Sequence, residues 1–282
     1  MLTTRGGVRV LAPSDLDDFL ALAGQDPVVN VFAIHRAMTT NLDPRWLGGE
    51  MWGRYDGGEL VAACHAAANL VPVQAGEDDA VAFADRAAAH DRTTSTIVGP
   101  QRAVRPFWER LGDAWGTPRE LRWDQRHLVL DRAPLVTPDP EVRFSERGDL
   151  DALYPACVAM YTEEVGVSPQ TSRGSGDLYR ARVVQLINRG WSFVRYDGDE
   201  VVFKAEVAWA TPQCAQVQGV WVPPHRRGEG LASAGMAAVV ALVLEEVAPV
   251  VSLYVNEWNQ PARQAYESVG FIETARFATV MF

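Results

Sequence analysis

Cysteine is scarce in this chain of 282 residues, which contains only Cys64, Cys157 and Cys214. The three lie far apart, and none belongs to a Cys-x-x-Cys pair or to a cluster with histidine. A zinc site needs several such ligands at short spacing, and a disulfide framework needs an even set of cysteines. We therefore expect no metal site and no disulfide, and we expect each cysteine to be a small buried side chain in a reducing compartment.

Long apolar runs and an excess of basic residues are also missing. The longest apolar run, residues 236–244, is far too short to cross a bilayer, and the N-terminal stretch MLTTRGGVRVLAPSDLDD has no apolar core of signal-peptide length. The formal net charge is −10, whereas binding to nucleic-acid phosphates needs a clustered basic surface. We expect a cytoplasmic protein without membrane or nucleic-acid partners; the sequence leaves its oligomeric state open.

The chain is expected to form two domains of similar construction. Residues 134–140 hold three prolines, which disfavour both a helix and a central strand, so this segment is typical of an extended linker. Each side of it opens alike, with VRVLAPSDLDDFLAL near the start and VRFSERGDLDALYPA after the prolines. We predict a first domain over 1–133, the linker, and a second domain over 141–282, related by duplication.

The second half predicts alternating helices and strands. We expect helices over 150–164, 177–188, 229–246 and 259–269, strands over 191–196, 200–210, 215–222 and 250–255, and a terminal strand pair within 271–282. Antiparallel strands followed by a β-α-β unit predict an α+β fold, with a mixed, mostly antiparallel sheet flanked by helices.

The stretch VWVPPHRRGEGLAS, residues 220–233, places a basic, glycine-rich turn between a strand and a helix. Gly228 and Gly230 can adopt positive φ and let a ligand approach the backbone closely. The first amides of a helix lack partners within it and face an anion there, and the cations at 225–227 add to that attraction. The turn favours a phosphate or pyrophosphate; the alternative is a tight turn with solvated arginines.

The strand before this turn is expected to end in unpaired backbone. Gly219 interrupts a β-forming run, as bulges often do, and the two prolines at 223–224 cannot donate to a strand ladder. An extended ligand could therefore pair with the backbone of residues 220–222.

A second stretch, NQPARQAYESVGF at 259–271, predicts a well-capped helix. Asn259 is a good N-cap, and Gly270 a good residue after the last turn. Ala262 and Tyr266 lie four residues apart, on the same face of this helix. Because the alanine side chain is small, it leaves room for a ligand next to the Tyr266 phenol. The alternative is that Tyr266 is an ordinary core residue.

Together the two stretches resemble the GNAT superfamily of acyl-coenzyme A-dependent N-acyltransferases. Residues 227–232 are similar to that family's pyrophosphate loop, R-x-x-G-x-A, and residues 259–271 to its second coenzyme motif. The resemblance covers residues 141–282, and the tandem layout with a divergent first copy is similar to actinobacterial two-domain GNAT proteins. It implies the GNAT fold in two copies and transfer of an acetyl group from acetyl-CoA to a primary amine. The alternative is a non-catalytic acyl-CoA-binding sensor or regulatory module.

The resemblance also implies roles for particular residues. Backbone amides of 228–232 with Arg227 would hold the pyrophosphate, the backbone of Val220 and Val222 would pair with pantetheine, and Tyr266 would protonate the leaving thiolate. The coenzyme-binding set is Val220, Val222, Arg227, Gly228, Glu229, Gly230, Leu231, Ala232, Asn259, Ala262 and Tyr266. The amine acceptor, the acyl-chain length and the general base stay open.

Three carboxylates are candidates for the general base. Glu206 is the first, because it lies on the strand before the coenzyme-binding strand; Lys204 shares its face, so the two could instead form a surface ion pair. Glu163 and Glu164, at the end of the first helix, could line the acceptor side or form a solvated helix end. Ordered water could carry the proton in place of a side chain.

The first half departs from the coenzyme pattern. Residues 98–112 resemble a degenerate copy of the second motif in which Trp108 stands where Tyr266 stands, and an indole has no useful acidity. No counterpart of the R-x-x-G-x-A turn precedes it. We expect this half to bind no acyl-CoA productively and its histidines to be structural or solvated: His35, His65, His90 and His127.

Overall fold

The computed structural model describes residues 7–171 and 174–282, which form two compact units. The first unit comprises Met1–His127 and Thr274–Phe282, and the second Leu128–Glu273. The last strand of the sequence thus belongs to the first unit, whereas the sequence placed it in a second domain ending at residue 282.

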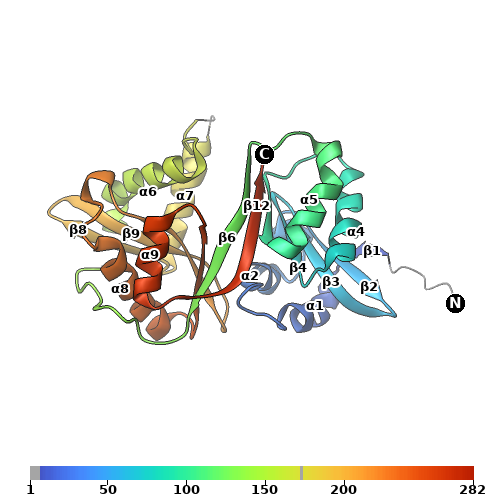
Figure 1. Cartoon of the computed structure of the whole chain (residues 1–282), viewed down its shortest axis with the longest axis horizontal. Helices are drawn as coiled ribbons and strands as arrows, with labels where there is room; N and C mark the ends of the chain where they lie inside the picture. The colour runs from blue at the N-terminus through green and yellow to red at the C-terminus, as the bar shows by residue number, and fades with distance from the viewer. Residues whose placement is uncertain (1–6, 172–173) are drawn as a thin grey trace. The chain divides into compact units, whose positions relative to one another are not determined.

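The first unit is a sheet with helices on both faces (Figure 1). The sheet order within it is β1-β2-β3-β4-β5-β12-β6. Helices α4 and α5 share one apolar core with the sheet, and α1 and α2 share another with the opposite face, since alternate residues of β3 enter the two cores. The strands are β1 (Val8–Val10), β2 (Glu50–Asp56), β3 (Glu59–Ala66), β4 (Asn69–Val73), β5 (Thr96–Pro100), β6 (Glu120–Leu130) and β12 (Ile272–Met281); the helices are α1 (Leu16–Ala23), α2 (Val31–Thr40), α3 (Pro44–Leu47), α4 (Glu77–Ala88) and α5 (Gln101–Trp115).

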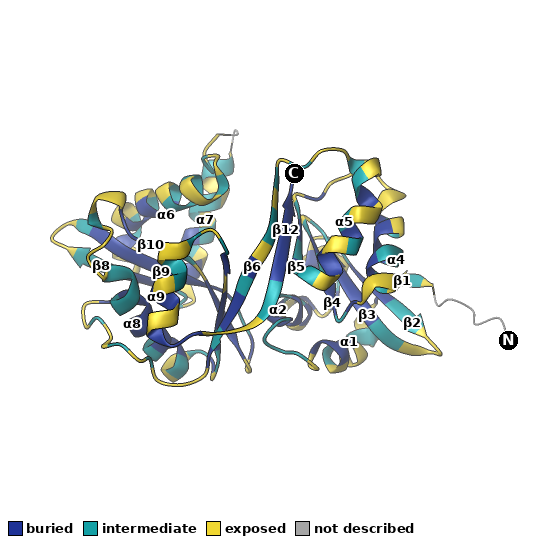
Figure 2. Cartoon of the chain, viewed as in Figure 1, coloured by how far each residue is buried: buried dark blue, intermediate teal, exposed yellow. Residues whose placement is uncertain are grey.

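The second unit repeats this plan. Its strands run in the order β11-β10-β9-β8-β7; β10 and β11 are parallel, and the other pairs are antiparallel. Helices α8 and α9 cover the core on one face, and α6 and α7 pack against the other, with the interior of both layers buried (Figure 2). The strands are β7 (Arg143–Phe144), β8 (Ser192–Asp197), β9 (Glu200–Ala210), β10 (Ala215–Trp221) and β11 (Val251–Asn256); the helices are α6 (Leu150–Val165), α7 (Ser175–Asn188), α8 (Leu231–Glu246) and α9 (Gln260–Val269). The predicted α+β fold in two tandem copies is confirmed.

The two units share particular contacts as well as topology. Arg9 pairs with Asp15 at 2.7 Å, and Arg143 pairs with Asp149 at 2.7 Å, each over a separation of six residues. The letters RYDG stand at the end of both β2 and β8, and both hairpins shift register between the Arg and the Tyr. Matching bulges and ion pairs at matching positions support the duplication that the similar openings predicted.

The expected strand pair within 271–282 is wrong, because those residues form the single strand β12. The segment contains no Pro, Gly, Asn or Asp beyond its start, so no turn divides it. Its backbone pairs antiparallel with β5 of the first unit, from Phe277 opposite Pro100 to Met281 opposite Thr96.

The proline-rich segment 134–140 has no helix or strand, as predicted, yet it is fixed to the second unit. The amide of Leu135 donates to the Val269 carbonyl at 2.8 Å, and that of Asp139 to the Ala234 carbonyl at 3.1 Å. The Asp139 carboxylate also lies 2.7 Å from Arg195 of β8. It is therefore an ordered strap along α8 and α9.

Candidate functional site

The parallel strands β10 and β11 separate after a short contact. Their paired residues are Ala215 with Val251 and Gln216 with Ser252, and no later pairing joins them in the described part of the unit. On its other side, β10 has the predicted bulge: its register against β9 shifts between Gln218 and Trp221. The last residues of β10 therefore present backbone groups to a gap in the sheet, as an extended ligand requires.

Gly219 is needed at the bulge for two reasons. Its φ is +61°, a conformation that favours glycine. A Cβ at this position would also lie 3.0 Å from Cδ of Glu206 and 3.1 Å from Nζ of Lys204. The backbone at Gly219 thus closely approaches charged side chains of the protein itself.

The turn after β10 has the conformation that its glycines indicated. Gly228 and Gly230 have φ of +85° and +82°, and α8 begins at Leu231 with Gly230 as its N-cap. The amides of residues 228–233 have no hydrogen-bond acceptor among the described residues, and a Cβ at either glycine would meet nothing within 4 Å. Unpartnered amides before open space fit an anion such as a diphosphate.

Arg227 is half-exposed, but its guanidinium is paired with groups of the protein. Its Nη2 lies 2.8 and 2.7 Å from the two carboxylate oxygens of Glu163 at the end of α6, and its Nε donates to the Val222 carbonyl at 3.1 Å. Trp221 Nε1 donates to the same carboxylate at 3.1 Å. The hydrogen bond from Arg227 lowers the pKa of Glu163, which makes this carboxylate a weaker base.

The other two cations of the turn are also paired. His225 Nε2 lies 2.8 Å from Glu200, and Arg226 contacts Asp197 at 3.0 Å and Glu229 at 3.0 Å. The β8–β9 hairpin thus anchors the turn. The attraction of the turn for an anion comes mainly from the amides, because carboxylates already contact all three basic side chains.

Lys204 and Glu206 form an ion pair, as the alternative interpretation held, but the pair is buried and does not lie on the surface. Nζ lies 3.0 Å from Oε2 of Glu206, with 0% and 9% of the two side chains exposed. Gln218 of β10 donates to Oε1 at 2.8 Å, a contact that the sequence analysis missed although antiparallel pairing places 218 opposite 206. Burial acts to lower the pKa of Lys204, but attraction to Glu206 outweighs it and raises that pKa.

Helix α9 is capped as predicted. The Asn259 side chain accepts from the Ala262 amide at 3.3 Å, and Gly270 ends the helix with φ of +110°. Tyr266 is buried in the core beneath α8 and α9, as the alternative interpretation held. Its hydroxyl has no hydrogen-bond partner within the described residues, and burial, followed by the charge of Glu164, raises its pKa.

The remaining predicted coenzyme-binding residues border the same core. Val222 is buried in it, and four half-buried side chains pack against it: Val220, Leu231, Ala232 and Ala262. The fold therefore gathers the end of β10, the start of α8 and the face of α9 around one apolar cluster, although 44 positions of sequence separate Gln218 from Ala262.

Comparisons with known proteins agree with this geometry. Residues 168–271 match the model of the acetyltransferase (GNAT) family. The match lies within the second unit, which is therefore similar to GNAT acetyltransferases. Residues 49–153 match a domain family of unknown function, DUF4081. A comparison with curated proteins gives no match.

Solved structures resemble the whole chain. A GCN5-related N-acetyltransferase from Sphaerobacter thermophilus has 19% identity and a TM-score of 0.63, covering 99% of this chain and 96% of its own. A GNAT-family acetyltransferase from Colwellia psychrerythraea has 13% identity and a TM-score of 0.59, covering 98% and 99%. A tandem GNAT protein from the clavulanic acid biosynthesis pathway has 15% identity and a TM-score of 0.56, covering 97% and 98%. At these identities the likeness shows the fold, which is the GNAT fold in tandem.

The first GNAT-like unit lacks an open anion site at the matching helix. Helix α4 begins with Glu77, Asp78 and Asp79, and Oδ2 of Asp79 accepts from the Gly76 amide at 2.9 Å. An acidic side chain of the chain itself therefore lies at this helix N-terminus, where α8 has unpartnered amides.

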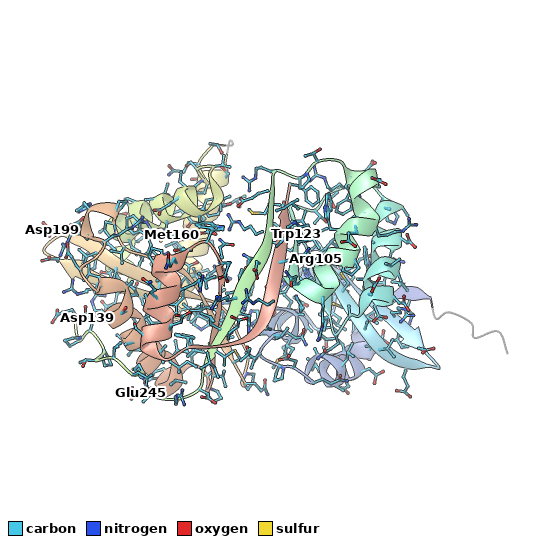
Figure 3. All side chains as sticks on the ribbon, in the orientation of Figure 1. Arg105, Trp123, Asp139, Met160, Asp199 and Glu245 are labelled. Atoms are coloured by element: carbon cyan, nitrogen blue, oxygen red, sulfur yellow. The ribbon has the colours of Figure 1, made fainter. Side chains whose placement is uncertain are left out.

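The predicted counterpart of Tyr266 is also a packing residue. Trp108 of α5 packs against the core of the first unit, and its ring centre lies 5.6 Å from that of Phe282. Nearby, the guanidinium of Arg105 lies 4.9 Å from the centre of the Trp123 ring (Figure 3).

The residues predicted to have no ligand role are mostly buried. All three cysteines are buried and form no disulfide, and His35, His65 and His127 are buried as well. Over the described ranges, no three His, Cys, Asp or Glu side chains gather as metal ligands would, and no helix combines the length and apolar character that a bilayer crossing needs.

Proposed function

We propose that the second unit transfers an acetyl group from acetyl-CoA to a primary amine by direct attack on the thioester. The observation that carries this proposal is the gap beside β10, which ends at the unpartnered amides of residues 228–233. One binding path thus offers backbone partners for an extended thioester arm and helix amides for a diphosphate.

In this proposal the coenzyme is held by backbone more than by side chains. Amides of 228–232 would bind the diphosphate, and the backbone of Val220 and Val222 would pair with pantetheine. A backbone N–H at the end of β10 would stabilise the developing oxyanion, an effect worth about 3 kcal/mol for one donor. Asn259 fixes the start of α9, and Ala262 leaves space beside it.

Tyr266 is the proposed acid for the leaving thiolate. The residue is buried, but its hydroxyl has no partner among the described residues, so it would be available to the sulfur atom of a bound thioester. A raised pKa keeps the phenol protonated, and a thiolate leaving into the same dry environment has its own pKa raised by burial.

Glu206 is the proposed base, acting directly or through water. Lys204 and Gln218 each donate to one of its oxygens, which holds the carboxylate in place while leaving further lone pairs for a water molecule. Glu163 is the second candidate, but its ion pair with Arg227 must first open.

The alternative function is a sensor that binds acyl-CoA without transferring the group. The contacts of both carboxylates favour it, since Glu206 and Glu163 are already held by donors of the protein. Thiol release from acetyl-CoA, measured with a panel of peptide N-termini, lysine, polyamines, amino sugars and aminoglycosides, separates the two. Binding of acetyl-CoA with no amine-dependent thiol release would reject the enzyme in favour of the sensor, and absence of binding would reject both.

A further inference from the structure

Arg227 joins three elements of the second unit at the proposed coenzyme path. Its Nε holds the Val222 carbonyl at the end of β10, and its Nη2 holds Glu163 at the end of α6. Trp221, between the two valines assigned to pantetheine, donates to the same carboxylate. Glu163 thus fixes both the arginine and the strand end that the coenzyme would use.

We propose that Glu163 competes with the coenzyme diphosphate for Arg227, so that coenzyme binding releases the last turn of α6. This inference rests on the proposed function and adds a form of regulation to it. The diphosphate would lie at the amides of 228–232, which follow Arg227 directly in the sequence. Arg227 contacts the carboxylate through Nη2 alone, and a guanidinium held in this way can turn to a phosphate, with which it also forms charge-assisted hydrogen bonds.

The exposure of the ion pair supports an exchange of partners. Arg227 and Glu163 have 46% and 49% of their side chains exposed, so water can solvate both when they separate. An exposed pair of this kind contributes little to stability and opens at small cost. The neighbouring pair of Lys204 and Glu206, with 0% and 9% exposed, has no such freedom, because separation would leave a buried charge.

The test is a double-mutant cycle on the full chain, with coenzyme A affinity measured by calorimetry. Glu163→Gln removes the competing charge and should tighten binding by about two- to five-fold. Arg227→Gln should weaken binding by about tenfold. In the Arg227→Gln background, Glu163→Gln should change affinity by less than about twofold, because the two residues act through each other.

Glu245→Gln is the matched control, since it removes the same charge from an exposed position at the far end of α8 (Figure 3). Structural damage weakens binding and does not tighten it, so tighter binding by Glu163→Gln beyond this control supports the competition. Equal or weaker binding would overturn the inference, as would the same gain in the Arg227→Gln background.

Hydrogen exchange provides a second measurement. The Gly166 amide donates to the Thr162 carbonyl at 2.9 Å in the turn that Glu163 anchors. Saturating coenzyme A should speed exchange across residues 161–166 in the wild type and have no effect there in Glu163→Gln. If the wild type binds coenzyme A with no change in that segment, the inference fails and the proposed function stands. If the wild type binds no coenzyme A, the proposed function itself fails.

Discussion

In each unit, one helix connects the two parallel strands: α4 in the first unit and α8 in the second. These two helices begin in opposite ways. Helix α8 begins after two glycines of positive φ and presents unpartnered amides. Helix α4 begins with three acidic residues, and the side chain of one of them, Asp79, accepts from the Gly76 amide. The same fold thus provides a helix N-terminus twice and leaves only one open to an anion. The difference shows that a few side chains decide whether this helix N-terminus is open to a ligand or capped by the protein's own carboxylate.

The strands β3 and β9, which come one strand earlier in each unit, also differ in the side chains that they bury. The matched hairpins place Ala63 and His65 of β3 where β9 has Lys204 and Glu206. All four side chains are buried, but the first unit has a neutral imidazole there and the second a charge pair held by Gln218.

The largest effect is expected from Tyr266→Phe. Loss of the proposed acid should lower kcat by about 10²- to 10⁴-fold while coenzyme affinity changes little. Trp108→Phe, at the matching place of the first unit, should leave kcat unchanged. Steady-state and single-turnover rates with an amine found in the panel measure both; equal kcat for wild type and Tyr266→Phe when chemistry limits the rate would remove Tyr266 from the mechanism.

Lys204→Ala should destabilise the second unit by about 3–5 kcal/mol, because Glu206 is left as an unpaired buried charge. Adding Glu206→His, which installs the residues of the first unit, should restore much of that loss. The stability of both variants is measured by chemical denaturation and by hydrogen exchange of the amides in β8–β10. A double variant no more stable than Lys204→Ala would show that the two units do not tolerate each other's residues.

The first unit should lose stability in mild acid. Burial lowers the pKa of His65 and of His127 to about 4, whereas the unfolded chain has an ordinary histidine pKa of about 6.5. Stability from the neutral imidazoles is complete above pH of about 6.5 and is lost as the pH falls toward 4, by up to about 3 kcal/mol for each histidine.

Hydrogen exchange of each unit between pH 7 and 4.5 measures this loss. The second unit has only His225, which is exposed, and should change less over that range. His65→Gln should flatten the profile of the first unit; an unchanged profile would assign the acid sensitivity to other groups.

The smallest effect is expected from Ser233→Asp, which gives α8 an acidic residue at the position that Asp79 occupies in α4. The carboxylate should repel a diphosphate and weaken coenzyme A binding by about 10- to 100-fold. Ser233→Asn has nearly the same shape without the charge and should bind as the wild type does. Calorimetry on both variants decides; equal affinities would mean that the diphosphate does not lie at this helix N-terminus.

Much of the second unit could be predicted because its signals are local. Period-2 and helical patterns located its elements to within one or two residues, and Asn259, Gly219, Gly228 and Gly230 have the conformations that their types favour. The partners of charged side chains could not be predicted in this way. Arg227 and Glu163 are 64 positions apart, and only the packing of α6 against β10 brings them together.

The sequence by itself determined where helices and strands form, where the turns need glycine, and which stretches resemble a coenzyme-binding family, because these depend on neighbours along the chain. Only the tertiary structure decided that β12 completes the first unit, that Lys204 and Glu206 are buried, and that carboxylates hold the basic turn. Those outcomes depend on which strand edges and charged side chains lie next to each other in the folded chain. Folding lowers the free energy by pairing these polar groups, which are far apart in the sequence.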